Sequence, residues 1–361
     1  MEGINKLKAI GIVGCGRVSV RYKEVFSMEG ISGGQVVSVC DLVPGRSEKL
    51  ASELGARSFV NMEEMFEKEN LDLVFILTES GNHYKHSKFC LDHDVNVIVE
   101  KPVTLRVKEA FDLIKLSEKK RLMFGVVFQN RYNPSVKYIR KLSEDNVFGK
   151  LILSTVRVRW CRYQDYYEDG WHGSWSMDGG VIAQQAIHHL DVLQWISGQV
   201  ESVCSMQTKR LNNLEAEDTT VAILKFRDGS LGAIEATTAA RPKDYEASFS
   251  IVGEKGLAEI GGIALNEIKK ITLSDNEIDE KEIKNTYSQD VPNGYGLGHG
   301  PLIQDAVNRL NAGVLEPPVS ASDGINTLKL VHALYKSEEN KSWINLDDNP
   351  ESSFLGIGSH D

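Results

Sequence analysis

Short runs of apolar, β-branched residues alternate with stretches of helical periodicity over the first third of the chain. The runs fall at Ala9–Val13, Val36–Cys40, Leu71–Thr78, Val95–Val99 and Leu122–Phe128. Between them the spacing of apolar positions predicts helices near residues 17–28, 45–55, 61–69, 83–93 and 104–121. Strands that alternate with helices predict a parallel, doubly wound sheet covered on both faces.

From about residue 130 the pattern changes to longer alternating runs, which favour an antiparallel sheet. They lie at Ile152–Trp160, Glu201–Leu211, Thr219–Phe226, Gly229–Thr237 and Glu246–Gly253, with an Asp228-Gly229 hairpin turn. Helices are predicted near 179–197, 300–312 and 321–337. The charged stretch Ser274–Asp290 predicts an exposed edge or loop, and we expect the last ten residues to fray.

The two patterns predict two domains. Residues 1–129 form an α/β domain with a doubly wound parallel sheet, and residues 130–361 an α+β domain on a large, mostly antiparallel open sheet. The helix near 321–337 is expected to pack back on the first domain.

The amino-acid composition argues against some classes of binding partner. The 361 residues carry a formal net charge of −10, which argues against nucleic acid or an anionic membrane as the main partner. No signal-peptide core or membrane-spanning apolar run is present. The five scattered cysteines lack a CxxC pair, so we expect reduced thiols, a cytoplasmic protein and no metal site.

A glycine-rich turn follows the first predicted strand. Gly14 and Gly16 allow a tight turn against a diphosphate, and the next helix would direct its N-terminal amides at that anion. Ser19 replaces the third glycine of the fingerprint. Asp41 follows roughly 20 residues later, where a carboxylate binds the ribose diol and repels a 2′-phosphate. The pattern predicts NAD rather than NADP; the alternative is an ordinary tight turn.

Glu100-Lys101-Pro102 ends the fourth predicted strand, at the sheet edge where ligands bind in this architecture. A lysine there can reach both the cofactor and a substrate hydroxyl, and Pro102 can adopt the cis form. The alternative is a surface lysine at a strand end.

A Gly179-Gly180 pair precedes a predicted helix on which Gln184, His188 and Asp191 follow at helical spacing. Oxidation of a secondary alcohol needs a proton acceptor, and histidine suits that role near neutral pH. We therefore predict His188 as the base, against the alternative of a core histidine. His189 points away, and metal ligation by adjacent histidines on a helix is disfavoured.

Arginines and aromatic residues concentrate after the first domain, which suits an anionic nucleotide sugar; the alternative is an oligomer interface, with Arg157 and Arg159 pointing away from a site.

The Gly-rich loop 291–301 leads into a helix with Pro301 in its first turn, and it is either a phosphate site or a plain connection. The predicted substrate contacts are Lys101, Arg131, Asn133, Arg159, Tyr166, Trp171, Gln184, His188, Tyr295 and His299.

Gly14-Cys15-Gly16, Asp41, Glu100-Lys101-Pro102 and Gly179-Gly180…His188-His189-Leu190-Asp191 together resemble the Gfo/Idh/MocA oxidoreductase family over nearly the whole chain. The resemblance implies a Rossmann domain, then an open-sheet domain whose sheet face forms a homodimer or homotetramer. It also implies catalytic roles for Lys101 and His188. Many members carry an aspartate where this chain has Gln184, and a neutral amide cannot relay a proton. The predicted cofactor contacts are Gly14, Cys15, Gly16, Arg17, Val18, Asp41, Thr78, Asn82, His83, Glu100, Lys101 and Gln129.

The segments 129–134, 159–162 and 171–175 with Tyr166-Tyr167 resemble more narrowly the UDP-N-acetyl-glucosaminuronate 3-dehydrogenase subgroup of bacterial surface-polysaccharide pathways. This implies NAD-dependent oxidation of a ring hydroxyl, at C3, of a UDP-linked N-acetylated sugar or its uronic acid. The alternatives are a dehydrogenase of a free polyol or aldose such as an inositol, a non-catalytic dinucleotide-binding regulator, and a structural oligomer with a vestigial pocket.

Overall fold

The computed structural model describes residues 7–274 and 278–357. These residues form two compact units: the residues up to Phe128 together with His299–Ile325, and Gln129–Gly298 together with the residues from Asn326 onward. The domain boundary at residue 129 stays a prediction. Residues 299–325 join the first unit because the side chains of Gln304 and Asn311 hydrogen-bond the backbone at Ser32 and Gly33.

The first unit contains a six-stranded sheet in which every neighbouring pair is parallel. Its strands are β1 (Lys8–Val13), β2 (Gly34–Cys40), β3 (Arg57–Phe59), β4 (Leu73–Ile76), β5 (Asn96–Val99) and β6 (Phe124–Val126), in the spatial order β3-β2-β1-β4-β5-β6. All four residues of β4 are buried, so layers cover both faces of the sheet there. The predicted doubly wound sheet is confirmed; β3 was missed because it has only three residues and two are exposed.

The first unit also contains helices, and all of the following except α10 connect or flank these strands along the chain. They are α1 (Ser19–Glu24), which continues as the π-helical turn η1 (Val25–Glu29), α2 (Pro44–Leu54), α3 (Met62–Lys68), α4 (His83–Asp92), α5 (Val107–Lys120) and α10 (His299–Asn311), with the short 3₁₀ turn η2 (Ser80–Asn82). Pro301 lies in the first turn of α10, as predicted.

The second unit contains a mostly antiparallel eight-stranded sheet in the order β13-β12-β11-β7-β10-β9-β8-β14. Only the pair β7–β10 is parallel among its described ladders. The strands are β7 (Leu151–Arg159), β8 (Val200–Thr208), β9 (Thr219–Phe226), β10 (Leu231–Thr237), β11 (Glu246–Gly253), β12 (Gly256–Gly261), β13 (Glu267–Leu273) and β14 (Ile344–Asn345). Gly229 takes φ +88° in the predicted hairpin turn between β9 and β10.

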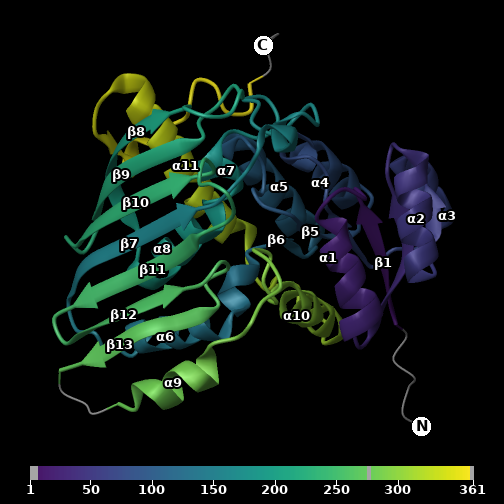
Figure 1. Ribbon diagram of the computed structural model, residues 1–361. Helices are drawn as coiled ribbons and strands as arrows, with labels where there is room; N and C mark the ends of the chain where they lie inside the picture. The colour runs from purple at the N-terminus through teal and green to yellow at the C-terminus, as the bar shows by residue number, and fades with distance from the viewer. Residues whose placement is uncertain (1–6, 275–277, 358–361) are drawn as a thin grey trace. The chain divides into compact units, whose positions relative to one another are not determined.

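One face of this sheet is covered and the other is open. Buried and exposed residues alternate strictly along β9 from Thr220 to Phe226, as expected for a strand with one solvated face. The helices of the unit are α6 (Pro134–Glu144), α7 (Val181–Gln184), α8 (Ile187–Ser197), α9 (Glu280–Tyr287) and the part of α11 (Ala321–Asn340) from Asn326 onward. Its 3₁₀ turns are η3 (Gln129–Tyr132), η4 (Gln164–Tyr167) and η5 (Leu346–Asp348). Helix α8 packs on β7 and β11 (Figure 1).

Two expectations for the C-terminal part are wrong. The stretch expected as an edge or loop contains α9, which Asp279 caps by accepting the backbone N–H of Glu282 and which packs on β13. Residues 275–277 of that stretch lie outside the described residues. Within the last ten residues, Ser352 and Leu355 are buried, so the described part of the tail is anchored; residues 358–361 are not described.

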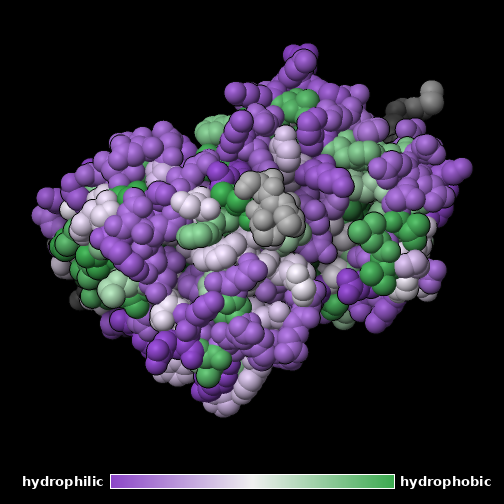
Figure 2. Space-filling view, turned by 90° about the horizontal axis from the view of Figure 1, so that it is seen from above, coloured by the Kyte–Doolittle hydropathy of each residue, from purple (hydrophilic) through white to green (hydrophobic). Residues whose placement is uncertain are grey.

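Hydrophilic residues predominate on the face shown in Figure 2, and hydrophobic residues gather in small groups between them. Among the helices of residues 7–274 and 278–357, none has the length and apolar content that a membrane crossing requires.

Candidate functional site

The glycine-rich turn after β1 is held by the backbone of the first unit. Gly14 has φ +95°, and a Cβ added there would lie 2.7 Å from the backbone of Leu77 and Thr78. Its N–H donates to the carbonyl of Cys40 at 2.8 Å. Around Gly16, by contrast, a Cβ would meet no atom of the described residues within 4 Å. The protein's own packing therefore requires a glycine at 14, whereas the space at 16 suits a ligand that approaches the backbone closely.

Asp41 lies against this turn, at the end of β2. Its carboxylate accepts the backbone N–H groups of Cys15 and Val43, each at 2.8 Å. An acid fixed beside the glycine turn is placed to bind a ribose diol. The glycine turn, the open space at Gly16 and Asp41 thus fit a dinucleotide with an unphosphorylated adenosine ribose.

Lys101 follows a buried acid. Glu100 is 6% exposed; its Oε1 accepts the hydroxyl of Tyr22 at 3.1 Å and lies 3.5 Å from Nε2 of His299. Burial alone would raise the pKa of Glu100, but hydrogen bonds from His299 and Tyr22 and the charge of Lys101 hold that pKa below its ordinary value. The Lys101–Pro102 peptide bond is cis, a form open to a bond that precedes proline.

Two residues predicted as ligand contacts are internal braces of the first unit. The ring of His83 is buried; its Nδ1 contacts the carbonyl of Pro102 at 2.6 Å and its Nε2 that of Thr78 at 3.0 Å, and burial lowers its pKa. His299 is 1% exposed and contacts Glu100. Because their rings are enclosed by protein, both histidines shape the Lys101 segment, and their predicted ligand contacts stay predictions.

The other predicted cofactor contacts lie at strand ends or turns. The Thr78 hydroxyl contacts His86 at 3.0 Å, and Asn82 donates to Glu79 at 3.1 Å. In the second unit Gln129 is 2% exposed, and its side-chain oxygen has no hydrogen-bond partner among the described residues. A buried amide oxygen of this kind is suited to a ligand.

In the second unit, a buried carboxyl supports the Gly179-Gly180 turn. Glu217 Oε1 accepts the backbone N–H of Ile182 at 3.0 Å and the hydroxyl of Tyr335 at 3.3 Å. A Cβ added at Gly180 would overlap Oε2 of Glu217, so no larger residue fits there. Burial is the main cause that raises the pKa of Glu217 to about 8, so this carboxyl is mostly protonated at neutral pH.

The helix that carries His188 is interrupted. Helix α7 ends at Gln184 and α8 begins at Ile187, because the N–H groups of Gln185 and Ala186 both donate to the carbonyl of Val181. The expected continuous helix is therefore wrong. His188 is 8% exposed at the start of α8. His189 is fully buried, and burial lowers its pKa to about 4, so it is neutral.

Two residues predicted as sugar contacts, Arg131 and Asn133, hold η3 and the start of α6 in place, and their predicted role toward a sugar stays a prediction. Arg131 forms a bidentate ion pair with Asp191 of α8, at 2.8 and 2.6 Å, and lies over the ring of Trp195. Asn133 is buried and donates to the carbonyl of Ala264 at 2.7 Å. The Asp191–Arg131 pair fixes the helix that carries His188 to η3.

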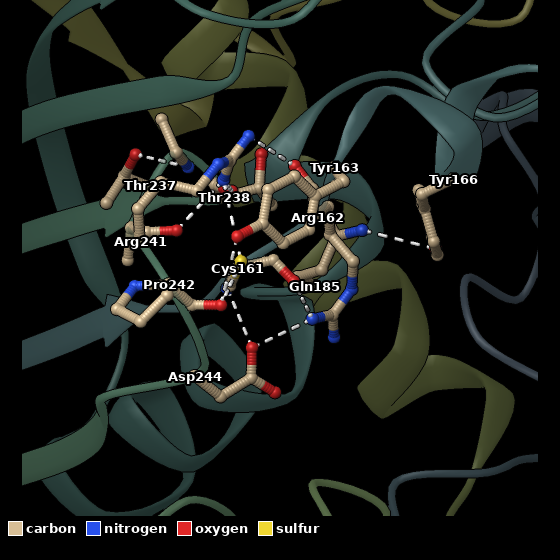
Figure 3. Close-up of polar contacts among 12 residues, drawn as sticks. Cys161, Arg162, Tyr163, Tyr166, Gln185, Thr237, Thr238, Arg241, Pro242 and Asp244 are labelled. Atoms are coloured by element: carbon tan, nitrogen blue, oxygen red, sulfur yellow. Dashed lines mark hydrogen bonds and ion pairs between the residues drawn. The ribbon is translucent and has the colours of Figure 1, made fainter.

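Two arginines near the end of β7, Arg162 and Arg241, are held by contacts with neighbouring residues of the second unit (Figure 3). Arg162 donates to Asp244 at 2.9 Å, and Asp244 also accepts the backbone N–H of Cys161. Arg241 lies over the ring of Tyr163 and donates to the carbonyl of Arg162 at 2.9 Å.

Tyr166 of η4 lies next to Arg162. Its ring is under the guanidinium of Arg162, its hydroxyl accepts Nε2 of Gln185 at 3.3 Å, and burial raises its pKa. It is thus attached to the segment between α7 and α8. Trp171 is half-buried and stacks on His172, whereas Tyr295 is 39% exposed.

Arg159 lies on the open face of the eight-stranded sheet. It donates to Glu235 at 2.6 and 2.9 Å and to Glu246 at 3.2 Å, and Arg157 lies on the same face. The open face is opposite the one that α8 covers, so Arg159 and Arg157 point away from His188, and the predicted sugar contact at Arg159 is not supported.

Three polar groups near these segments were not predicted: Asp178, Glu217 and Tyr335. Asp178 directly precedes the glycine pair, so its position in the motif was a usable signal. Glu217 and Tyr335 are distant in sequence and carry no local pattern. No cluster of three or more His, Cys, Asp or Glu side chains in the described ranges could hold a metal ion.

Comparison with known families matches both parts of the chain. Residues 8–128 match the family model described as oxidoreductase family, NAD-binding Rossmann fold, and residues 140–346 match its C-terminal alpha/beta domain. The chain therefore belongs to the Gfo/Idh/MocA oxidoreductase family. Its first unit is the NAD-binding Rossmann domain of that family, and the predicted cofactor, NAD, is confirmed.

Two solved structures similar to the chain are WlbA dehydrogenases in complex with NADH and UDP-GlcNAcA. The Chromobacterium violaceum enzyme is 30% identical, with a TM-score of 0.87 over 94% of this chain and 96% of the other. The Bordetella pertussis enzyme is 31% identical, with a TM-score of 0.87 over 94% and 98%. A myo-inositol 2-dehydrogenase from Thermotoga maritima is 24% identical over 94% of this chain and 98% of that protein. The chain is thus an NAD-dependent oxidoreductase with relatives of two substrate classes.

Proposed function

We propose that the protein oxidises a ring hydroxyl, at C3, of a UDP-linked N-acetylated sugar or sugar uronic acid, with NAD as the oxidant, in the synthesis of a bacterial surface polysaccharide. The observation that supports this most is the similarity, at 30–31% identity and over 94% of the chain, to two enzymes crystallised with NADH and UDP-GlcNAcA. The matched inositol dehydrogenase of Thermotoga maritima is only 24% identical over the same share of the chain.

We assign the oxidation of the hydroxyl to two side chains, those of Lys101 and His188. The ammonium of Lys101 binds the reacting hydroxyl and stabilises the negative charge that develops on its oxygen. The imidazole of His188 accepts the hydroxyl proton. When bound, NAD takes up the hydride that leaves the carbon. The Glu100 carboxylate beside Lys101 and the Asp191–Arg131 ion pair on α8 hold these two groups in their segments.

Substrate recognition is assigned to groups near His188 in the second unit. Tyr166 and Gln184 are attached to the α7–α8 segment and are suited to contact the sugar. Trp171 and Tyr295 offer partly exposed aromatic surface for the sugar or the base.

A substrate panel tests the proposal. Initial rates of NADH formation are measured with UDP-GlcNAc, UDP-GlcNAcA, UDP-glucose, myo-inositol and scyllo-inositol. We expect one of the N-acetylated nucleotide sugars to have a kcat/KM at least 100-fold above that of either inositol. Equal or better turnover of an inositol would replace the proposal by the polyol alternative. Absence of turnover with every alcohol, together with tight NADH binding, would favour a non-catalytic regulator.

The homo-oligomer and the cytoplasmic location stay predictions. The open face of the second sheet exposes apolar side chains, among them Met206, Val221, Ile223 and Leu231. Such a face is suited to a second copy of the chain. Light scattering after size exclusion should give a dimer or tetramer mass, and Ile223→Lys should lower it.

A further inference from the structure

The carboxylate of Asp178 accepts buried hydrogen bonds on both of its oxygens. It is 1% exposed and directly precedes the Gly179-Gly180 turn. Its Oδ2 accepts the backbone N–H of Gly173 at 2.9 Å. Its Oδ1 accepts the side-chain Nε2 of Gln184 at 2.5 Å. Each oxygen of the carboxylate is therefore engaged by an N–H group.

This arrangement decides which way the Gln184 amide faces. A primary amide carries its donors on nitrogen and its acceptor on oxygen, and it can usually be turned over at little cost. An ionised carboxylate only accepts, so it selects the nitrogen of Gln184. The carbonyl oxygen Oε1 must then occupy the opposite corner of the amide. A carbonyl oxygen has two lone pairs and can accept more than one hydrogen bond.

We propose that Asp178 is a positioning residue for substrate recognition, which turns Gln184 so that its carbonyl oxygen accepts a hydrogen bond from a hydroxyl or amide N–H of the substrate. The inference rests on the proposed function, because it requires a substrate that carries such a donor. The inference gives Gln184 the role of a hydrogen-bond acceptor, which its carbonyl oxygen can fill even though the side chain carries no charge.

A second buried carboxyl, Glu217, supports the segment that carries Gln184. It is mostly protonated near neutral pH, since burial and the charge of Asp178 raise its pKa to about 8. The contacts from Glu217 to Ile182 and Tyr335 hold α7, and with it the backbone of Gln184, in place.

A four-member variant cycle tests the proposal. In Asp178→Asn the introduced amide has one acceptor oxygen, whereas Asp178 accepts from two donors, the N–H of Gly173 and the Nε2 of Gln184. The introduced oxygen keeps the bond to Gly173, so Gln184 turns to accept from the introduced NH₂ group and presents its own NH₂ group to the substrate. In Gln184→Glu two carboxylates face each other across the 2.5 Å contact. In the double variant, the introduced asparagine donates to the introduced glutamate and still accepts from Gly173, so that position 184 again presents an acceptor. We expect each single variant to lose at least tenfold in kcat/KM and the double variant to return to within threefold of the wild type.

A donor-deletion readout separates recognition from folding. The best sugar of the panel is compared with its deoxyfluoro analogues, because fluorine cannot donate a hydrogen bond. The wild type should discriminate against fluorine at one ring position by at least tenfold, and Asp178→Asn should remove that discrimination. Glu168→Gln, an exposed carboxylate in the same part of the chain, should stay within twofold of the wild type, and NADH affinity should not change in any variant.

The outcomes distinguish this inference from the proposed function. If the double variant regains thermal stability but neither kcat/KM nor the hydroxyl-to-fluorine ratio, Asp178 is structural only and the inference is overturned. If the wild type oxidises a polyol in place of nucleotide sugars, the proposed function fails and the cycle is run with that polyol, where loss of rescue overturns the inference. If the wild type oxidises no alcohol, both fail together.

Discussion

The two glycine turns of the molecule, at Gly14 in the first unit and at Gly179-Gly180 in the second, are held in different ways. Gly14 faces the neutral backbone of Leu77 and Thr78, and the turn is bonded to the adjacent strand at Cys40. Gly180 faces the buried carboxyl of Glu217. The first turn depends on neighbouring strands of one sheet and on the partly exposed carboxylate of Asp41, which accepts the backbone N–H of Cys15. The second depends on a protonated acid from a distant segment, so the two turns should respond differently to pH and to substitution.

The largest expected effect concerns the chemistry assigned to each unit. Lys101→Met and His188→Ala should each lower kcat by about 10²–10⁴-fold, the range that a lost acid–base or charge-stabilising group produces. The dissociation constant of NADH, measured by fluorescence titration, should change less than threefold for His188→Ala, since the cofactor cradle lies in the first unit. A variant that keeps more than a tenth of the wild-type kcat would remove that residue from the mechanism.

The second prediction compares alanine at two glycines. Gly180→Ala should destabilise the second unit by about 3 kcal/mol or more, because the added Cβ meets both the backbone and the side chain of Glu217. Gly16→Ala should leave the melting temperature within a few degrees, because open space surrounds that position. It should nevertheless weaken NADH binding about tenfold, since a methyl group then occupies space needed by the diphosphate.

Thermal melts and NADH titrations of the two alanine variants provide the measurement. A stable Gly180→Ala protein would show that the Glu217 contact yields easily, and an unchanged NADH affinity in Gly16→Ala would show that the diphosphate does not approach this residue.

The contrast between the two turns also explains which parts of the fold and of the candidate site could be predicted from the sequence. The parallel sheet, Gly14, Gly16 and Asp41 could be read from the sequence, because each is imposed by a local pattern in which strand, turn and acid follow at short spacing. Glu217 and Tyr335 could not, since they meet Gly180 only through folding of distant segments. For the same reason the internal contacts of Arg131 with Asp191 and of His299 with Glu100 could not be predicted from the sequence.

The third prediction uses pH to distinguish the turns. The pKa of Glu217 rises from 4.5 to about 8 on folding, so between these values the folded protein holds a proton that the unfolded chain has released. Stability from this group is therefore fully present below pH 4.5 and is lost as pH rises toward 8, by up to about 1.4 kcal/mol per pH unit.

Glu217→Gln should remove that dependence. Urea unfolding at pH 5, 6.5 and 8 should show the variant gaining stability relative to the wild type as pH rises. Glu254→Gln, an exposed carboxyl, serves as the matched control and should follow the wild type. Parallel pH profiles for the wild type and Glu217→Gln would mean that Glu217 is ionised in the folded protein.

The smallest expected effect concerns the choice of cofactor at the first turn. Asp41→Asn keeps an acceptor for one of the two N–H groups at Cys15 and Val43 but removes the negative charge. Repulsion of a 2′-phosphate should weaken, so the ratio of kcat/KM for NADP to that for NAD should rise about tenfold, equivalent to about 1.4 kcal/mol. Asp92→Asn, which alters an exposed carboxylate of α4, should leave the ratio unchanged. A ratio that stays constant in Asp41→Asn would mean that discrimination against the 2′-phosphate comes from the shape of the first turn and not from its charge.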